Sequence, residues 1–370
     1  MTSPEPPGRK WRVAVLMGGN STERTVSLST GKMILKALDP QQYSVTAIDT
    51  QDILPLPGSP DPLPASEERA QAQLEAEHAA AMPEPAGLPV PAGVSSELVR
   101  PDGEKPDVVF IALHGKGGED GTIQALLELL GLPYTGSGVL ASALAMDKSM
   151  SKRLFRAEGI PVIPDVQVRR DPAWTEAALI EYVCASLGGF PVFVKPNAEG
   201  STFGCTLVKS PDQLPEAVAL ALRYDPLALI EQYVRGMEIT VGVLENPEDA
   251  SDLQPLPVIE IVPKNEYYDY ESKYAEGGSE HIIPARLPEA TLRRAQELAV
   301  RCHQVLGCRG MSRTDLIVAG EQLFVLEVNT IPGMTPTSLL PQAADYAGIS
   351  FPTLLDRLIA CALNKGVNRA

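Results

Sequence analysis

The chain has few cysteines and no basic clusters. Its five cysteines, an odd number without regular spacing, argue against a disulfide framework or a zinc site and favour a reducing compartment. The 31 Lys and Arg residues stand against 47 Asp and Glu, a net charge of −16, and they form no run. Nucleic acid is therefore not expected as a partner.

Long apolar runs are also missing. No stretch approaches the ~20 residues that a membrane-spanning helix needs. The apolar run 13–17 is too short for the core of a signal peptide and continues directly into Gly18 and Gly19. We therefore expect no membrane partner and a cytoplasmic location. The composition, 44% hydrophobic and 21% charged, is typical of a soluble globular protein, and the length suggests two or three domains.

Short apolar strands followed by helices predict an α/β fold. A strand over 11–17 precedes a glycine turn and a helix reaching 28–38, which Ser or Thr can cap. A buried strand over 108–113 precedes a glycine-rich turn and a helix over 122–130. Residues 55–105 are rich in Pro and Ala, and we expect them to be a partly mobile surface insertion without chemistry.

A predicted hairpin near the C-terminus gathers polar side chains. Glu327 and Asn329 share one face of a strand, because strand side chains alternate. If residues 319–321 form the turn, Asp315 lies opposite Val325 and joins that face. Two carboxylates and an amide oxygen suit Mg²⁺ held together with substrate phosphates. A solvated outer face of the hairpin explains the same residues, and the hairpin by itself leaves both interpretations open.

Two further segments have more than one interpretation. The loop 198–204 carries Gly200 and Gly204 and follows a strand that ends near Lys195, so it can fold over phosphates, although a mobile hairpin explains it too. It lacks the order of a P-loop. The segment 267–274 has four tyrosines in eight residues, which favours either a lid over a site or an oligomer interface.

Together these motifs resemble the D-alanine–D-alanine ligase family of ATP-grasp carboxylate–amine ligases. The resemblance covers most of the chain. It is carried by Gly18–Arg24, His114–Gln124, Tyr134–Gly138, Met146–Ser149, Lys195–Pro196, Glu199–Ser201, Tyr268–Tyr274, Arg313–Asp315 and Glu327–Leu339. Thr25 stands where the family often has an acidic residue, Phe203 lies in the phosphate loop, and short members have no counterpart of 55–105.

The resemblance implies an α/β, three-domain ATP-grasp architecture with an N-terminal Rossmann-like parallel-sheet domain. The expected domains are residues 1–145, 146–237 and 238–370, with ATP held between the second and third. The implied cofactors are ATP and two Mg²⁺ or Mn²⁺ ions.

The resemblance also implies roles for individual residues. The metal ligands would be Asp315, Glu327 and Asn329. ATP would be bound by Lys148, Lys195, Glu199, Gly200, Ser201, Glu231, Gln232, Val234, Glu238 and Lys273. The catalytic set would be Glu23, Ser201, Tyr274, Arg313, Gly333 and Ser338. The amino-acid substrates would contact Glu23, His114, Arg313, Gly333, Ser338 and Leu339.

The implied reaction joins two D-alanines through an acyl phosphate. The product serves the synthesis of peptidoglycan precursors and hence cell-wall biogenesis and cell shape. The resemblance also implies a homodimer. One alternative is a ligase of D-alanine and D-lactate, or another ATP-grasp amino-acid ligase. Depsipeptide-forming relatives replace the lid tyrosine, so Tyr274 favours the dipeptide. A nucleotide-binding regulator without catalysis is a more distant alternative. It would be expected to lose Arg313, Asp315, Glu327 or Asn329, and all four are present.

Overall fold

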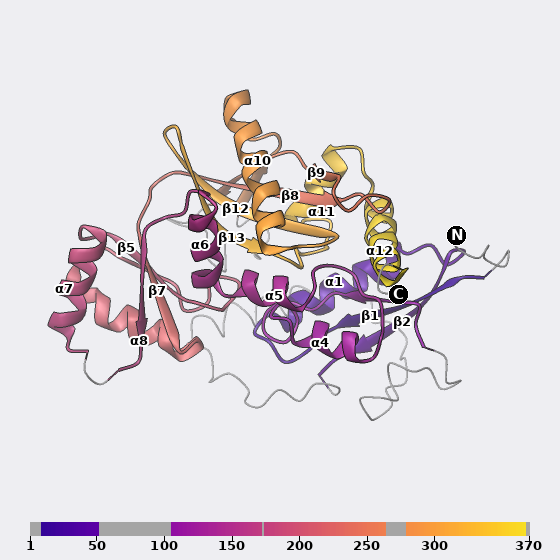
Figure 1. Ribbon diagram of the computed structural model, residues 1–370, viewed down its shortest axis with the longest axis horizontal. Coiled ribbons are helices and arrows are strands. Elements are labelled where there is room, and N and C mark those ends of the chain that lie inside the picture. Colours follow the sequence, from indigo (N-terminus) through magenta and orange to yellow (C-terminus); the bar gives the residue numbers. More distant parts are fainter. Residues whose placement is uncertain (1–8, 52–104, 172–173, 264–278, 368–370) are drawn as a thin grey trace.

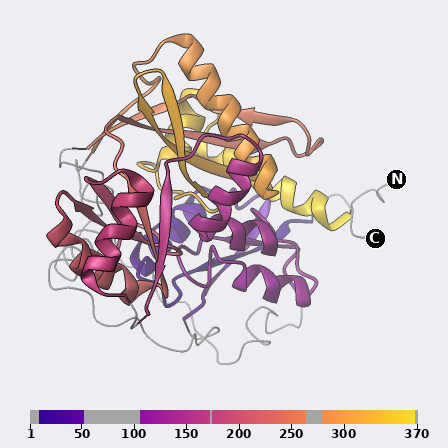
Figure 2. The same ribbon diagram turned by 60° about the vertical axis from the view of Figure 1, so that its left-hand side comes forward.

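A computed structural model shows three groups of elements that meet near the centre of the molecule (Figures 1 and 2). The structure describes residues 9–51, 105–171, 174–263 and 279–367. The predicted insertion, apart from its last residue, and the tyrosine-rich segment with Lys273 and Tyr274 lie outside the described residues.

The N-terminal group is a parallel sheet, as the family resemblance implied, and its strands lie in the order β2-β1-β3. Its strands are β1 (Trp11–Met17), β2 (Tyr43–Asp49) and β3 (Val108–Ile111). The four residues of β3 are all buried, which fits a central position under helices. The helices of this region are α1 (Arg24–Ala37), α4 (Thr122–Leu129) and α5 (Val139–Met146).

The predicted Ser or Thr cap of α1 is wrong. Glu23 occupies the N-cap position, and no side chain there caps the helix. The Ser21 hydroxyl instead donates to the carbonyl of His114, 2.7 Å away, and so ties the first glycine turn to the second. This bridge matters for the site, because both turns follow neighbouring parallel strands and carry side chains of interest.

The central group is an antiparallel sheet in the order β4-β7-β5-β6, packed against two helices. Its elements are β4 (Asp165–Arg169), α7 (Glu176–Leu187), β5 (Val192–Pro196), β6 (Thr206–Val208), α8 (Leu214–Tyr224) and β7 (Leu227–Gln232). A short 3₁₀ turn, Pro211–Gln213, leads into α8. Val183 and Ala221 are fully buried between the helices and the sheet.

The C-terminal group is a sheet ordered β11-β10-β8-β12-β13, with β9 paired to β8. Its strands are β8 (Met237–Glu245), β9 (Leu253–Pro255), β10 (Ile259–Pro263), β11 (Ser279–Ile282), β12 (Met311–Ala319) and β13 (Gln322–Asn329). Its helices are α10 (Glu289–Leu306), α11 (Leu339–Tyr346) and α12 (Phe351–Val367).

Packing crosses the predicted domain boundaries. Helix α6 (Lys148–Ala157) packs against α10, and its Phe155 lies in the core of the C-terminal sheet. Helix α12 packs against β3 and α1, so the end of the chain helps to cover the N-terminal sheet (Figure 1). The boundaries at 145 and 237 stay predictions.

The predicted register of the β12–β13 hairpin is wrong, but Asp315 and Glu327 lie on the same face, as predicted. The turn has two residues, Gly320 and Glu321, because Ala319 pairs with Gln322. A bulge then lets Asp315 pair with Glu327, where Val325 was predicted. The alternation of buried and less buried side chains along β13 also shifts by one residue at this bulge. The two one-residue differences add up to a shift of two residues, and because side chains alternate along a strand, Asp315 and Glu327 still share a face.

Among the described residues, no single helix is both long and apolar enough to cross a membrane. One sharply bent pair, α11 with the following helix, passes the same length and composition test together.

Candidate active site

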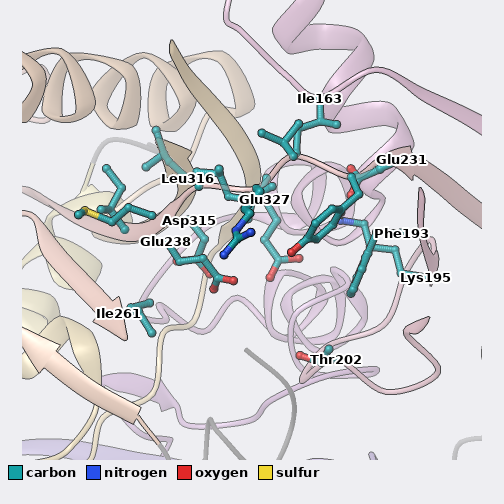
Figure 3. Close-up of a pocket in the computed structure, with 18 of the residues that line it drawn as sticks. Ile163, Phe193, Lys195, Thr202, Glu231, Glu238, Ile261, Asp315, Leu316 and Glu327 are labelled. Atoms are coloured by element: carbon teal, nitrogen blue, oxygen red, sulfur yellow. Dashed lines mark ion pairs between the residues drawn. The ribbon is translucent and has the colours of Figure 1, made fainter. Parts of the chain in front are cut away.

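A cavity of about 400 Å³ opens between the central and C-terminal sheets (Figure 3). One part of its wall is apolar: Ile163, Phe193, Met237, Ile239, Ile261 and Leu316. The other part brings together charged residues that the sequence singled out: Lys148, Lys195, Glu231, Glu238, Asp315 and Glu327. Gln232 and Val234 line it as well. An apolar slot beside clustered charges suits a ligand with a flat ring and an anionic tail.

Buried ion pairs fix the position of Lys195. Its Nζ lies 2.8 Å from Oε2 of Glu231, and the second carboxylate oxygen of Glu231 pairs with Lys152. Lys152 also lies 3.3 Å from Asp165. Burial alone would raise the pKa of Glu231, but the two ammonium groups hold it at about 2. Glu231 is therefore a fixed negative charge whose side chain is fully engaged with lysines.

Oxygen atoms of the hairpin converge beside this cavity. The guanidinium of Arg313 donates to both oxygens of Asp315, at 2.9 and 2.8 Å. The hydroxyl of Thr240 donates to Asp315 at 2.6 Å, and the Asn329 amide donates to it at 3.2 Å. Glu327 lies opposite Asp315 and 3.2 Å from Nζ of Lys148.

This donor set fits divalent metal ions that are also held by phosphate oxygens. Hard oxygen ligands suit Mg²⁺, which rarely takes all its ligands from protein. Within the part of the chain that the structure describes, no group of three His, Cys, Asp or Glu side chains is arranged to hold a metal alone. Two carboxylates and one amide are therefore an open set, which needs further oxygens from a substrate.

A second cavity, of about 180 Å³, adjoins the first, and Glu327 lines both. It is polar and is lined by residues from the two glycine turns, the hairpin and the segment before α11. The members predicted from the sequence are Glu23, His114, Gly200, Ser201, Arg313, Asn329, Gly333, Ser338 and Leu339. Glu327 therefore lies where a group bound in the second cavity is adjacent to a group bound in the first.

The loop between β5 and β6 closes over this junction. The hydroxyl of Ser201 donates to Glu23, 178 residues away in the chain. Nζ of Lys148 donates to the carbonyl of Glu199 at 2.7 Å. A Cβ at Gly200 would lie 2.4 Å from Oε2 of Glu23, so a larger residue there would displace the Glu23 carboxylate. Ser201 and Thr202 have φ angles of 50° and 64°, a strained backbone of the kind found at functional sites.

Lys116 provides a second attachment of the same loop. Its Nζ lies 2.7 Å from the Glu199 carboxylate and also 2.7 Å from the carbonyl of Tyr224. Thr22 donates to the other Glu199 oxygen at 3.3 Å. Both glycine turns of the N-terminal sheet therefore contact the loop that covers the cavities.

Two groups in the second cavity are held electrically neutral. Burial, with the nearby charge of Arg313, lowers the pKa of His114 to about 4. Burial and the charge of Glu23 raise the pKa of Glu119 to about 8. Glu119 accepts a hydrogen bond from the Gly115 N–H at 2.8 Å. Two carboxyl groups beside each other suit a cationic group, which both can contact.

A tight turn before α11 also lines the second cavity. Ser338 is the N-cap residue of that helix, and its hydroxyl contacts the Thr335 hydroxyl at 2.7 Å. A Cβ at Gly333 would lie 2.8 Å from Oγ of Ser338, so a larger residue there would displace the Ser338 hydroxyl. The first N–H groups of α11 and the Ser338 hydroxyl together form a place for an anion.

The structure brings together all predicted site residues that it describes; Lys273 and Tyr274 lie outside the described residues. Sequence analysis missed four residues that contact this set: Lys116, Glu119, Lys152 and His281. Lys116 and Glu119 lie inside the glycine-rich turn that follows the strand predicted over 108–113. Lys152 follows Lys148 by one helical turn, a spacing that could have indicated a shared face. No sequence signal marked His281.

Comparison with known proteins identifies the family. The D-ala D-ala ligase N-terminus family model matches residues 12–137, and the D-ala D-ala ligase C-terminus model matches residues 154–360. The chain belongs to the D-alanine–D-alanine ligase family. A family member from Syntrophobacter fumaroxidans is 46% identical over 357 residues, covering 96% of this chain and 98% of that protein. One from Pelotomaculum thermopropionicum is 42% identical over 362 residues, covering 97% and 99%.

Solved structures of D-alanine–D-alanine ligases share the fold. The ligase from Bacillus anthracis complexed with ATP is 29% identical, with a TM-score of 0.70, and the match covers 97% of this chain and 100% of that one. The ligase from Coxiella burnetii is 28% identical, with a TM-score of 0.75, over 97% and 96%. The predicted family and its ATP-grasp fold are confirmed.

Proposed function

We propose that this protein joins two D-alanines to D-alanyl-D-alanine with ATP, for the synthesis of peptidoglycan precursors. The observation that carries the proposal is the meeting of the two cavities at Glu327, with Arg313 beside the junction. The larger cavity has the shape and charges for ATP, and the smaller one is lined both by the Glu23 carboxylate and by the N-terminus of α11. A zwitterionic amino acid presents the matching charges.

ATP would bind with its adenine in the apolar slot. Because the Glu231 side chain is occupied by Lys152 and Lys195, this residue would offer mainly its backbone to the base, as would Gln232 and Val234. Glu238 would accept hydrogen bonds from the ribose hydroxyls. Lys148 and Lys195 would hold the phosphates, under the loop that contains Glu199, Gly200 and Ser201.

Asp315, Glu327 and Asn329 would hold two Mg²⁺ or Mn²⁺ ions, which neutralise phosphate charge when bound. Phosphoryl transfer depends mainly on positioning and charge neutralisation. In the proposed first step, the carboxylate of the first D-alanine attacks the γ-phosphate and gives an acyl phosphate and ADP. Glu23 would hold the ammonium group of this D-alanine, and His114 lines the same end of the cavity.

In the proposed second step, the ammonium group of the other D-alanine first loses a proton. The free amine then attacks the acyl carbon, the bond from that carbon to the phosphate oxygen breaks, and the amide is left after hydrogen phosphate departs. Ser338 and Leu339 would receive the carboxylate of this second substrate at the start of α11. Arg313 and the Gly333 N–H would donate to the oxyanion that develops on the acyl oxygen. The loop bond from Ser201 to Glu23 would exclude water, which would otherwise hydrolyse the acyl phosphate. The resemblance gives Lys273 and Tyr274 parts in the same closed site.

A coupled phosphate-release assay tests the proposal. The protein is incubated with ATP, Mg²⁺ and D-alanine, L-alanine, or D-alanine together with D-lactate at several pH values. Phosphate release with D-alanine, with D-alanyl-D-alanine as the product by mass spectrometry, is the expected result. Equal release with L-alanine, or a depsipeptide as main product, would contradict it. The homodimer and the cytoplasmic location stay predictions.

A further inference from the structure

A chain of hydrogen bonds connects the edge strand β11 to the start of α11. Nδ1 of His281 lies 3.2 Å from Oε1 of Gln342, and Nε2 of His281 lies 3.1 Å from the Ser279 hydroxyl. The Gln342 side chain continues the chain, because its Nε2 donates to the carbonyl of Thr337 at 2.6 Å. His281 itself lines the smaller cavity, as do Arg313 and Ser338.

The partners determine which ring nitrogen of His281 carries the proton. The amide nitrogen of Gln342 must face the Thr337 carbonyl, since the opposite orientation would place two acceptors against each other. Its oxygen therefore faces His281 and can only accept, so Nδ1 donates and Nε2 accepts from Ser279. Burial lowers the pKa of His281, and the charge of Arg313 acts in the same direction, while the hydrogen bond to Gln342 acts against them; the net direction favours the neutral ring.

Gln342 reaches both residues that lead into α11. Its backbone N–H donates to the Ser338 carbonyl at 3.1 Å, while its side chain holds Thr337. These two residues immediately precede Leu339, the first residue of the helix. A shift of Gln342 would therefore move the hydroxyl and N–H groups that face the smaller cavity. His281 fixes Gln342 from the sheet side.

We propose that His281 is a positioning residue for the second amino acid. Held between Ser279 and Gln342, its ring ties the sheet edge to the segment Thr337–Leu339, which receives that substrate's carboxylate. The inference rests on the proposed function and assigns specificity for one of the two substrate positions. His281 pairs across the strands with Ile261, which lines the larger cavity, whereas His281 itself lines the smaller one.

The test measures separate Michaelis constants for ATP and for the first and second D-alanine, from the two-site dependence of the rate on D-alanine. His281→Phe keeps the ring but loses both hydrogen bonds, and Gln342→Met removes the partner. Each should raise the constant for the second D-alanine about five- to tenfold, the worth of one or two hydrogen bonds. The constants for ATP and the first D-alanine should change less than twofold.

Two further variants separate positioning from a general structural effect. His281→Asn keeps a donor near the position of Nδ1 and should recover most of the lost affinity. Tyr346→Ala, at the exposed far end of α11, should leave all three constants unchanged. An unchanged second constant in both His281→Phe and Gln342→Met, or equal increases in all three constants, would overturn the inference. If one variant does not fold, the other and His281→Asn decide the matter. A wild-type protein that makes no dipeptide would refute the proposed function itself.

Discussion

Asp315 and Glu327 lie directly opposite each other on β12 and β13, although Glu327 is one residue farther from the shared turn. The extra residue is Leu326, which forms the bulge. Without a bulge, continued pairing from Leu316 and Val325 would place Glu327 opposite Thr314, whose side chain is buried on the other face. The bulge is therefore what brings the two carboxylates together.

Removal of Arg313 should abolish most product formation. Arg313→Ala loses the guanidinium at the cavity junction and the two hydrogen bonds to Asp315, and the loss of one such donor typically lowers the rate by about 10²–10³. The variant should still fold, which circular dichroism checks, while kcat is measured by phosphate release. Arg293→Ala, in an exposed pair with Glu289, is the control. Near-full turnover of Arg313→Ala would remove its assigned role.

Asn329 should affect the dependence on metal more than the fold. Asn329→Ala removes an amide oxygen from the proposed ligand set, and we expect the Mg²⁺ concentration at half-maximal rate to rise about tenfold or more. Titration of Mg²⁺ at fixed ATP measures this. Asn246→Ala, in an exposed turn after β8, should leave the titration as in the wild type. A superimposable curve for Asn329→Ala would argue against its place among the ligands.

Lys152 should prove important both for stability and for ATP binding. Lys152→Met removes an ammonium from a fully buried network, and breaking a buried pair on one side costs about 3–5 kcal/mol. Urea unfolding measures the loss, and a raised Michaelis constant for ATP should accompany it, since Lys195 and Glu231 shift. Glu231 keeps one partner in this variant, because Nζ of Lys195 still lies 2.8 Å from its Oε2. Adding Glu231→Gln removes that remaining ion pair and leaves the buried Lys195 without it, so the double variant should be no more stable than Lys152→Met alone. A more stable double variant would contradict the pairing argument.

Glu119 should make stability fall with rising pH. Its pKa is about 8 in the folded protein against an ordinary value of 4.5, so folding favours the protonated form. The contribution is complete below about pH 4.5 and is lost as the pH rises toward 8. Glu119→Gln resembles the protonated side chain. It should unfold at a higher urea concentration than the wild type at pH 8 and at a similar one near pH 5. If the stabilities of the two proteins changed with pH in parallel, the raised pKa of Glu119 would be disproved.

The units that begin with β1 and β3 could be predicted from residue patterns, because their strands are apolar runs that glycine turns separate from helices. Strands such as β2 and β9 were not predicted. The bulge at Leu326 could not be predicted, since Val325 and Leu326 are both apolar and either fits the core. The site needed the family resemblance, because its residues come from distant segments: Glu23 meets Ser201, and Lys152 meets Glu231. Their partners depend on tertiary packing, which no local spacing encodes.

The turn at Gly320 and Glu321 closes the hairpin at the end away from Arg313 and Asn329, and it is exposed. Strand β12 is also paired with β8 from Met311 to Val318, so its alignment at the other end does not depend on how the turn is closed. A fluorophore or a short affinity tag inserted between Gly320 and Glu321 would leave the carboxylates where they are. The hairpin thus offers an attachment point for following this protein in solution without disturbing its chemistry.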